Sequence, residues 1–167
     1  MRIDRLVDQA LPVCDWAMDT SQAEQVEAFA ELPHGSTTLL VVEDEPDVRE
    51  IATTVLRDLG YNVLEAADGE EALRVFSAHA GSVDLLLSDV VLPGRLRARD
   101  MVERITSLRP EVCVLYMSGY SENAIVHHGR LDDGVELISK PFKREQLAHK
   151  VAQVLGSRSR SGKADRA

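Results

Sequence analysis

The sequence has few cysteines, no long apolar runs and a shortage of positive charge. Its two cysteines, Cys14 and Cys113, lack metal-ligand spacing, and Cys113 lies in an apolar run, so we expect a small buried residue there. No apolar run approaches the length of a membrane span, and the start of the chain carries acids where a signal peptide would be apolar. These absences predict a cytoplasmic protein that does not bind membranes.

Positive charge is scarce: 19 Lys and Arg stand against 28 Asp and Glu, a formal net charge of −9. Proteins that bind nucleic acids neutralise phosphates with clustered Lys and Arg. The charge balance therefore argues against a nucleic-acid partner. The 167 residues are enough for one domain with its own core and an extension.

The composition changes along the chain and predicts three parts. Residues 1–37 are acidic and helical in pattern, with a break at Pro12 and a linker beginning at Pro33. Residues 38–156 form the main domain. Residues 157–167 are basic and rich in Ser and Gly, so we expect a disordered tail.

Short apolar runs alternate with longer amphipathic segments through the main domain. This alternation predicts an α/β fold in which five parallel strands form a sheet covered by helices on both faces. The runs expected to form strands are Leu39–Val42, Tyr61–Leu64, Val83–Leu87, Val112–Met117 and Val135–Ile138.

Five amphipathic segments predict the helices. The first begins at Pro46 and ends at Gly60. The others begin near Gly69, cover 101–108, cover 122–128 with a weak pattern, and run from about 143 to 155. The side chains expected to face inward are Val48, Ile51, Val55 and Leu59 in the first helix; Ala72, Leu73 and Phe76 in the second; Met101, Val102, Ile105 and Leu108 in the third; and Leu147, Val151 and Val154 in the last.

Charged or hydroxyl side chains follow four of the five apolar runs. Because ligands bind beyond the carboxyl ends of strands in such sheets, these side chains should converge on one edge. Carboxylates from two strands suit Mg²⁺, and the bound cation would offset their mutual repulsion so that Asp89 can attack phosphorus. Lys140 would pair with a phosphoryl oxygen, and the Ser118 hydroxyl would donate to another. The residues at the strand ends are Glu43, Asp44, Glu45, Ser88, Asp89, Ser118, Ser139 and Lys140.

Each of these residues also has a plainer interpretation. Asp89 alone could be a helix cap, and Glu43–Glu45 could be the charged first turn of a helix. Ser118 could belong to an ordinary turn, and Lys140 could be a solvated loop cation. Their shared position at the same end of separate strands favours a common site.

Four segments resemble the signature segments of response-regulator receiver domains, the CheY-like superfamily: LLVVEDEPDVRE, DLLLSDVVLPG, VLYMSGYS and LISKPF. The resemblance covers about 38–155. It implies a doubly wound, flavodoxin-like sheet of five parallel strands in the order 2-1-3-4-5. The sequence of residues 118–142 is similar to that of the receiver domains at the ends of hybrid sensor histidine kinases.

The resemblance implies roles for individual residues. Asp89 matches the phosphoacceptor and Ser118 the conserved hydroxyl. Lys140 matches the invariant lysine, whose bond to Pro141 is expected to be cis.

The resemblance also implies a bound Mg²⁺. Its expected ligands are Asp44, Asp89 and the backbone carbonyl of Val91, with Glu43 acting through water.

Three features depart from the family pattern. Leu137 stands where the family often has an aromatic side chain that moves on activation. The loop after Gly94 carries Arg95, Arg97 and Arg99, called the basic loop below, which is either solvated or contacts an acidic partner. Residues 1–35 have no assigned counterpart. They could cover a signalling face, form a homodimer, be the remnant of a larger neighbour or be an unstructured leader.

The resemblance implies a phosphoprotein of two-component signal transduction rather than an enzyme. Its expected partners are a histidine kinase or histidine phosphotransfer protein and a downstream protein, and no DNA-binding output domain is expected. The alternative is a phosphate sink or relay receiver in a split hybrid kinase system. An aspartyl-phosphate phosphatase is disfavoured, because Val91 occupies the place of the general acid two residues after the nucleophile.

Overall fold

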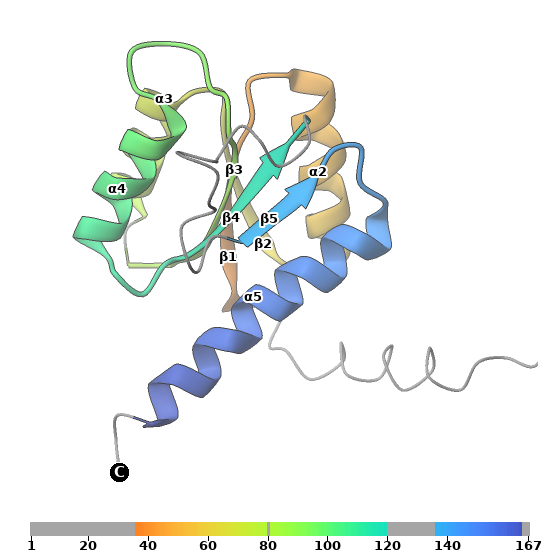
Figure 1. Cartoon of the computed structure of the whole chain (residues 1–167), viewed down its shortest axis with the longest axis vertical. Helices are drawn as coiled ribbons and strands as arrows, with labels where there is room; N and C mark the ends of the chain where they lie inside the picture. The colour runs from red at the N-terminus through yellow and green to blue at the C-terminus, as the bar shows by residue number, and fades with distance from the viewer. Residues whose placement is uncertain (1–35, 80, 120–135, 165–167) are drawn as a thin grey trace, which may run out of the picture. The chain divides into compact units, whose positions relative to one another are not determined.

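The computed structural model describes residues 36–79, 81–119 and 136–164, all within the unit Leu32–Ala167 (Figure 1). The predicted helices of 1–32, the predicted helix at 122–128 and the proposed docking or dimer contact of the N-terminal segment lie outside the described residues. None of the helices in the described part of the chain is long and apolar enough to cross a membrane.

A five-stranded parallel sheet forms the centre of the domain, in the order β2-β1-β3-β4-β5. Both the parallel sheet and the strand order implied by the resemblance are confirmed. The non-consecutive neighbours β1 and β3 mark the point where the chain reverses its direction across the sheet, which is where such folds place their ligand sites. The strands are β1 (Thr38–Val42), β2 (Asn62–Ala66), β3 (Val83–Asp89), β4 (Cys113–Ser118) and β5 (Glu136–Ser139).

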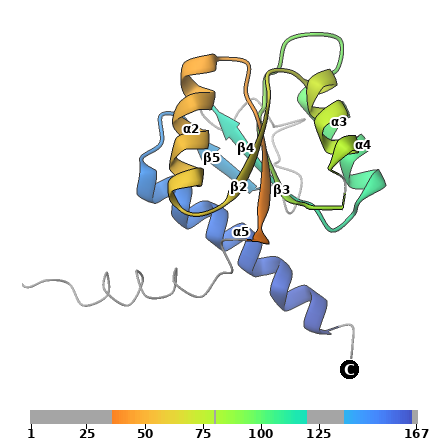
Figure 2. The ribbon, with the colours of Figure 1, turned by 180° about the vertical axis from the view of Figure 1, so that it is seen from behind.

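Helices cover both faces of this sheet (Figure 1 and, from behind, Figure 2). Alternate residues of β1 point to opposite faces, so Leu39 and Val41 belong to one buried cluster while Leu40 and Val42 belong to the other. The first cluster includes residues of α2 and α5, and the second includes residues of α3 and α4. These helices are α2 (Pro46–Asp58), α3 (Gly69–Ala78), α4 (Ala98–Leu108) and α5 (Arg144–Ala164).

Helix α2 packs only partly with the predicted face: Val55 and Leu59 are half-buried against the core, as expected. Ile51, expected to point inward, is 58% exposed, whereas Ala52, Thr53 and Leu56 are buried. The prediction that Ile51 faces inward is therefore wrong. One residue along a helix is a rotation of about 100°, and small side chains such as Ala52 let the helix approach the sheet closely.

In the other helices the inward positions are largely confirmed. Ala72 and Phe76 of α3 and Met101 and Ile105 of α4 are buried. Leu108, predicted to face inward, is 70% exposed. It is the last residue of α4, where a side chain has no following turn to pack against.

Helix α5 buries Leu147, Val151 and Val154 as predicted, but it does not end near Leu155. Its backbone stays helical to Ala164, beyond the predicted start of the tail at 157. Extending a helix that already exists adds one hydrogen bond for each residue fixed, and Arg, Lys and Ala are good helix formers.

Candidate functional site

The site begins where β1 and β3 end side by side. Val42, the last residue of β1, pairs with Ser88 of β3, so the next residues, Glu43 and Asp89, lie at the same edge of the sheet. Apolar residues fill β1 and the centre of β3, which buries this edge: Glu43 is 0% exposed and Asp89 is 9% exposed. Two carboxylates buried this far from solvent require a positive charge nearby.

Lys140 supplies that charge from the residue after β5. Its backbone N–H donates to the carbonyl of Ser118 at 2.6 Å, which brings the side chain beside the ends of β1 and β3. The ammonium Nζ donates to Asp89 Oδ2 at 2.6 Å and to Glu43 Oε2 at 2.7 Å. The Lys140–Pro141 bond is cis, as the resemblance implies.

Burial and these two bonds set the proton affinities of the bridge. Burial raises the pKa of Glu43 above its ordinary value, the hydrogen bond from Lys140 works against that rise, and the charge of Asp89 adds to it. Burial works to lower the pKa of Lys140, but its hydrogen bonds to Asp89 and Glu43 outweigh burial and raise the pKa. Lys140 therefore stays an ammonium at neutral pH.

The carboxylates of Glu43, Asp44 and Asp89 offer three oxygen ligands that lie within 4.8 Å of one another. Oxygen donors of this kind are what Mg²⁺ selects, and the exposed Asp44 leaves one side of the cluster open to solvent. The residues present therefore fit a magnesium ion. Val91 donates its N–H to Asp89 Oδ1 at 3.0 Å; a role for its carbonyl stays a prediction.

Ser118 ends β4 at the same edge. It is 4% exposed, and the residue before it, Met117, pairs with Asp89 across the sheet. Met117 also accepts a hydrogen bond from Val90 N–H at 3.0 Å, which fixes the chain directly after Asp89. Glu43, Asp44, Asp89, Ser118 and Lys140 thus lie at one edge of the sheet.

The family model for the response regulator receiver domain matches residues 39–152. The chain belongs to this family. Receiver domains act in two-component phosphorelay signalling, bind Mg²⁺ at an acidic pocket and interact with histidine kinases or phosphotransfer proteins. The cluster at Glu43, Asp44 and Asp89 is compatible with that pocket.

Curated relatives of this receiver domain are much longer proteins. Sensor kinase CckA of Brucella abortus is 33% identical over 153 residues, which cover 92% of this chain and 16% of that protein. The autoinducer 1 sensor kinase/phosphatase LuxN of Vibrio harveyi is 32% identical over 88% of this chain and 17% of its own length. A cyclic di-GMP phosphodiesterase of Thermotoga maritima is 32% identical over 72% of this chain and 32% of its length. The chain thus spans less than a third of these relatives.

Solved structures agree with this relationship. The receiver domain of the hybrid histidine kinase CckA is 39% identical, with a TM-score of 0.60 over 71% of this chain and 98% of that one. The chemotaxis response regulator CheY4 of Vibrio cholerae is 27% identical, with a TM-score of 0.60 over the same shares. The chain is homologous to hybrid kinase receivers.

Exposed and buried side chains alternate along the basic loop of this receiver domain. Its three arginines are exposed, while the residues between them, Leu96 and Ala98, are 7% and 2% exposed. Leu96 lies against Gly69 at the start of α3, where a Cβ would stand 2.7 Å from the Leu96 carbonyl oxygen. Arg99 already belongs to the first turn of α4, and its Nε donates to Glu103 Oε1 at 3.1 Å. The buried residues therefore anchor a segment whose arginines are exposed.

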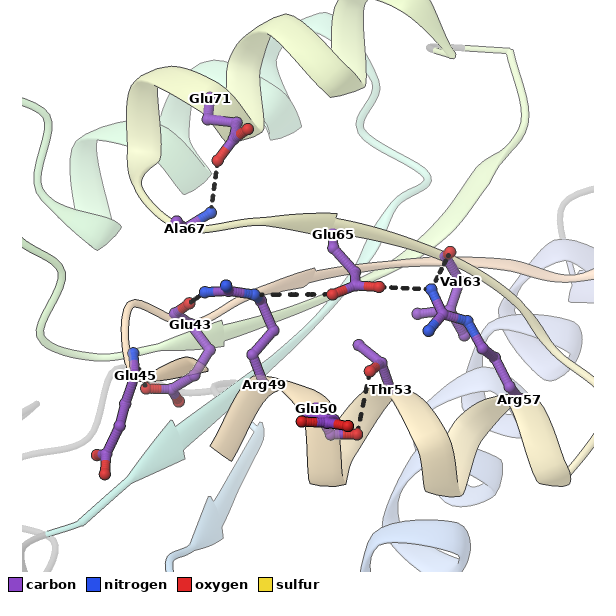
Figure 3. Close-up of polar contacts among 10 residues, drawn as sticks. All are labelled: Glu43, Glu45, Arg49, Glu50, Thr53, Arg57, Val63, Glu65, Ala67 and Glu71. Carbon is purple, nitrogen blue, oxygen red and sulfur yellow. Dashed lines mark hydrogen bonds and ion pairs between the residues drawn. The ribbon is translucent and has the colours of Figure 1, made fainter. Parts of the chain in front are cut away.

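Sequence reasoning missed one residue at the site, Arg49. Its guanidinium reaches back from α2 to the backbone of Glu43 (Figure 3). A cation near the start of a helix, where the helix dipole disfavours positive charge, was the available signal.

Proposed function

We propose that this receiver domain accepts a phosphoryl group on the Asp89 carboxylate from a histidine kinase or a histidine phosphotransfer protein. The observation that supports it best is the bridge in which Lys140 joins Asp89 and Glu43, at 2.6 and 2.7 Å, beside the exposed Asp44. A structural aspartate needs no second buried acid and no buried ammonium, so this arrangement favours chemistry at Asp89.

In the proposed reaction an Asp89 oxygen forms a bond to phosphorus while the bond from phosphorus to the donor nitrogen breaks. The electron pair of that bond leaves with the donor imidazole, and the product is an acyl phosphate on Asp89. Mg²⁺ held by Asp44, Asp89 and the carbonyl of Val91, with Glu43 acting through water, would neutralise charge on the phosphoryl oxygens.

The chain's own residues divide the remaining work. Lys140 is free to exchange its bond to Asp89 Oδ2 for one to a phosphoryl oxygen, because an ammonium on a long stem carries three donors. The Val91 N–H holds Asp89 Oδ1 at 3.0 Å and so fixes the carboxylate plane. Ser118, at the end of the neighbouring strand, would donate a hydrogen bond from its hydroxyl to the phosphoryl group and couple it to the segment that follows β4.

The relationship to CckA favours a second, related role. The match to that sensor kinase covers 153 residues, so it extends beyond 39–152, the residues that match the family model. This extension supports a receiver that exchanges phosphate within a hybrid kinase system, as a relay or sink. The chemistry at Asp89 is the same in both roles.

A labelling experiment with a small donor tests the proposal without knowledge of the partner. The full chain is incubated with radiolabelled acetyl phosphate, with Mg²⁺ or with EDTA. We expect base-labile label on the protein in Mg²⁺ and none in EDTA. Absence of label in Mg²⁺, or equal label in EDTA, would contradict the proposal.

A further inference from the structure

Arg49 holds the backbone of the acidic turn that joins β1 to α2. It lies in the first turn of α2, with a side chain that is 21% exposed. Its Nη1 donates a hydrogen bond of 2.6 Å to the carbonyl oxygen of Glu43 (Figure 3). A charged donor makes this bond stronger than an ordinary backbone bond.

A second contact fixes the other side of the guanidinium. Arg49 Nε lies 3.7 Å from Oε2 of Glu65 on β2. The other oxygen of Glu65 accepts from Arg57 Nη2 at 2.5 Å, and the same Arg57 nitrogen donates to the Val63 carbonyl at 3.4 Å. Two arginines of α2 thus contact Glu65, and of these two Arg49 is the one that also donates to Glu43 (Figure 3).

Arg49 holds the carbonyl side of this turn, while the Glu43 N–H is held separately by the Ala66 carbonyl at 3.1 Å. Glu45, the N-cap of α2, makes no side-chain cap hydrogen bond within the described residues. Its N–H donates to Glu43 Oε1 at 3.4 Å, which is long for a hydrogen bond. The carbonyl of Glu43 belongs to the peptide bond to Asp44, so holding this carbonyl restrains the backbone from which the Asp44 carboxylate extends.

We infer that Arg49 is a positioning residue for the metal site. By holding the Glu43 carbonyl it keeps the carboxylate of Asp44 facing that of Asp89, so that both can bind one Mg²⁺. This inference rests on the proposed function and adds a residue that touches neither the metal nor the phosphoryl group. Hydrogen-bonded supports of metal ligands contribute about 10- to 100-fold to metal affinity in other proteins.

The sign of the effect separates positioning from simple electrostatics. Removing a cation close to a magnesium site would by itself tighten the binding of Mg²⁺, because like charges repel. Positioning predicts the reverse: without Arg49 the acidic turn loosens and Mg²⁺ binds more weakly. A weaker affinity therefore cannot come from the lost charge.

Titration calorimetry with MgCl₂ on the full chain tests the inference. Arg49→Ala should weaken Mg²⁺ binding about tenfold, the lower end of the range for such supports. Arg57→Ala is the matched control, because it removes the same group from the same helix and from the same partner, Glu65, without touching Glu43. We expect Arg57→Ala to bind Mg²⁺ within about twofold of the unmodified chain, an ordinary result for a residue outside the site.

A second variant keeps the test valid if Arg49→Ala does not fold. Arg49→Lys retains the charge, but one ammonium cannot contact Glu43 and Glu65 at once as the guanidinium does. The affinity for Mg²⁺ should therefore fall about threefold, less than in Arg49→Ala. Equal Mg²⁺ affinity in the unmodified chain and in the folded Arg49 variants would overturn the inference and leave the proposed function standing. No Mg²⁺ binding by the unmodified chain would overturn both.

Discussion

Replacing Lys140 by methionine should destabilise the domain, although Lys140 lies at a site and not in the core. Methionine keeps most of the length of the side chain and removes its charge. The change leaves Glu43, whose side chain is 1% exposed, and Asp89, at 12%, without their common ammonium. Removing one partner of a buried ion pair costs about 3–5 kcal/mol.

The expected loss is near the lower end of that range, because the bridge lies at the edge of the sheet and Lys140 itself is 16% exposed. We therefore expect Lys140→Met to lower the free energy of unfolding by about 3 kcal/mol at pH 8, a fall of about 10 °C in Tm. Lys143→Met, at an exposed lysine just beyond the site, is the control and should change stability by less than about 0.5 kcal/mol.

The loss should depend on pH with a definite sign. Burial raises the pKa of Glu43, and the hydrogen bond from Lys140 works against the rise, so the variant should have a still higher pKa at Glu43. A carboxyl whose pKa is higher in the folded than in the unfolded state costs stability at high pH, and this cost shrinks as the pH falls through the folded value. The difference between Lys140→Met and the unmodified chain should therefore narrow from pH 8 to pH 5.

Urea unfolding followed by circular dichroism at several pH values measures this difference. A Lys140→Met variant as stable as the unmodified chain at pH 8 would refute the argument that the ammonium compensates two buried carboxylates. A loss of constant size from pH 5 to pH 8 would refute the part assigned to Glu43.

Three further predictions concern the surroundings of the site. Ser118→Ala should retain most of the labelling by acetyl phosphate, because Ser118 couples the phosphoryl group to the segment after β4 and does not accept it. A loss of label as complete as that of a phosphoacceptor mutant would show this role to be wrong. Changing all three arginines of the basic loop (95–99) to serine should leave labelling by acetyl phosphate unchanged and slow phosphotransfer from the cognate kinase, because exposed charges steer the encounter of two proteins. The slowing should be smaller at high salt. Equal slowing with both donors would refute this role of the arginines. Gly69→Ala should lower the free energy of unfolding in urea by about 1–3 kcal/mol, because the added Cβ would stand 2.7 Å from the Leu96 carbonyl oxygen. Gly81→Ala is the control and should be nearly neutral, because its Cβ would meet open space among the described residues. Equal stability of the two variants would contradict the packing argument.

The arrangement of the acidic and basic side chains could be predicted because it depends on a simple rule of parallel sheets. Residues that follow buried strands come to one edge, whatever the details of packing. Glu43, Asp89, Ser118 and Lys140 each follow or end a strand, and the structure brings all four to that edge. The same rule does not require knowledge of any side-chain contact.

Features that depend on how a helix is rotated or on how far a side chain reaches could not be predicted in this way. Ile51 and Ala52 are neighbours in sequence, and the close approach of α2 to the sheet selects the smaller one for burial. Arg49 contacts Glu43 because its long side chain reaches back from the first turn of α2 to the residue after β1. Spacing in the sequence does not reveal either geometry.

Site-specific loss of phosphorylation tests the central claim most directly. Asp84→Asn is the matched control, because Asp84 lies on β3 like Asp89 but near its other end, where its carboxylate accepts a hydrogen bond from Thr38 N–H at 3.0 Å that an asparagine side chain can also accept. In Mg²⁺ and acetyl phosphate we expect intact-protein mass spectrometry to show one added phosphoryl group on the unmodified chain and on Asp84→Asn, and none on a folded Asp89→Asn. Phosphorylation of Asp89→Asn to the level of the unmodified chain would contradict the account.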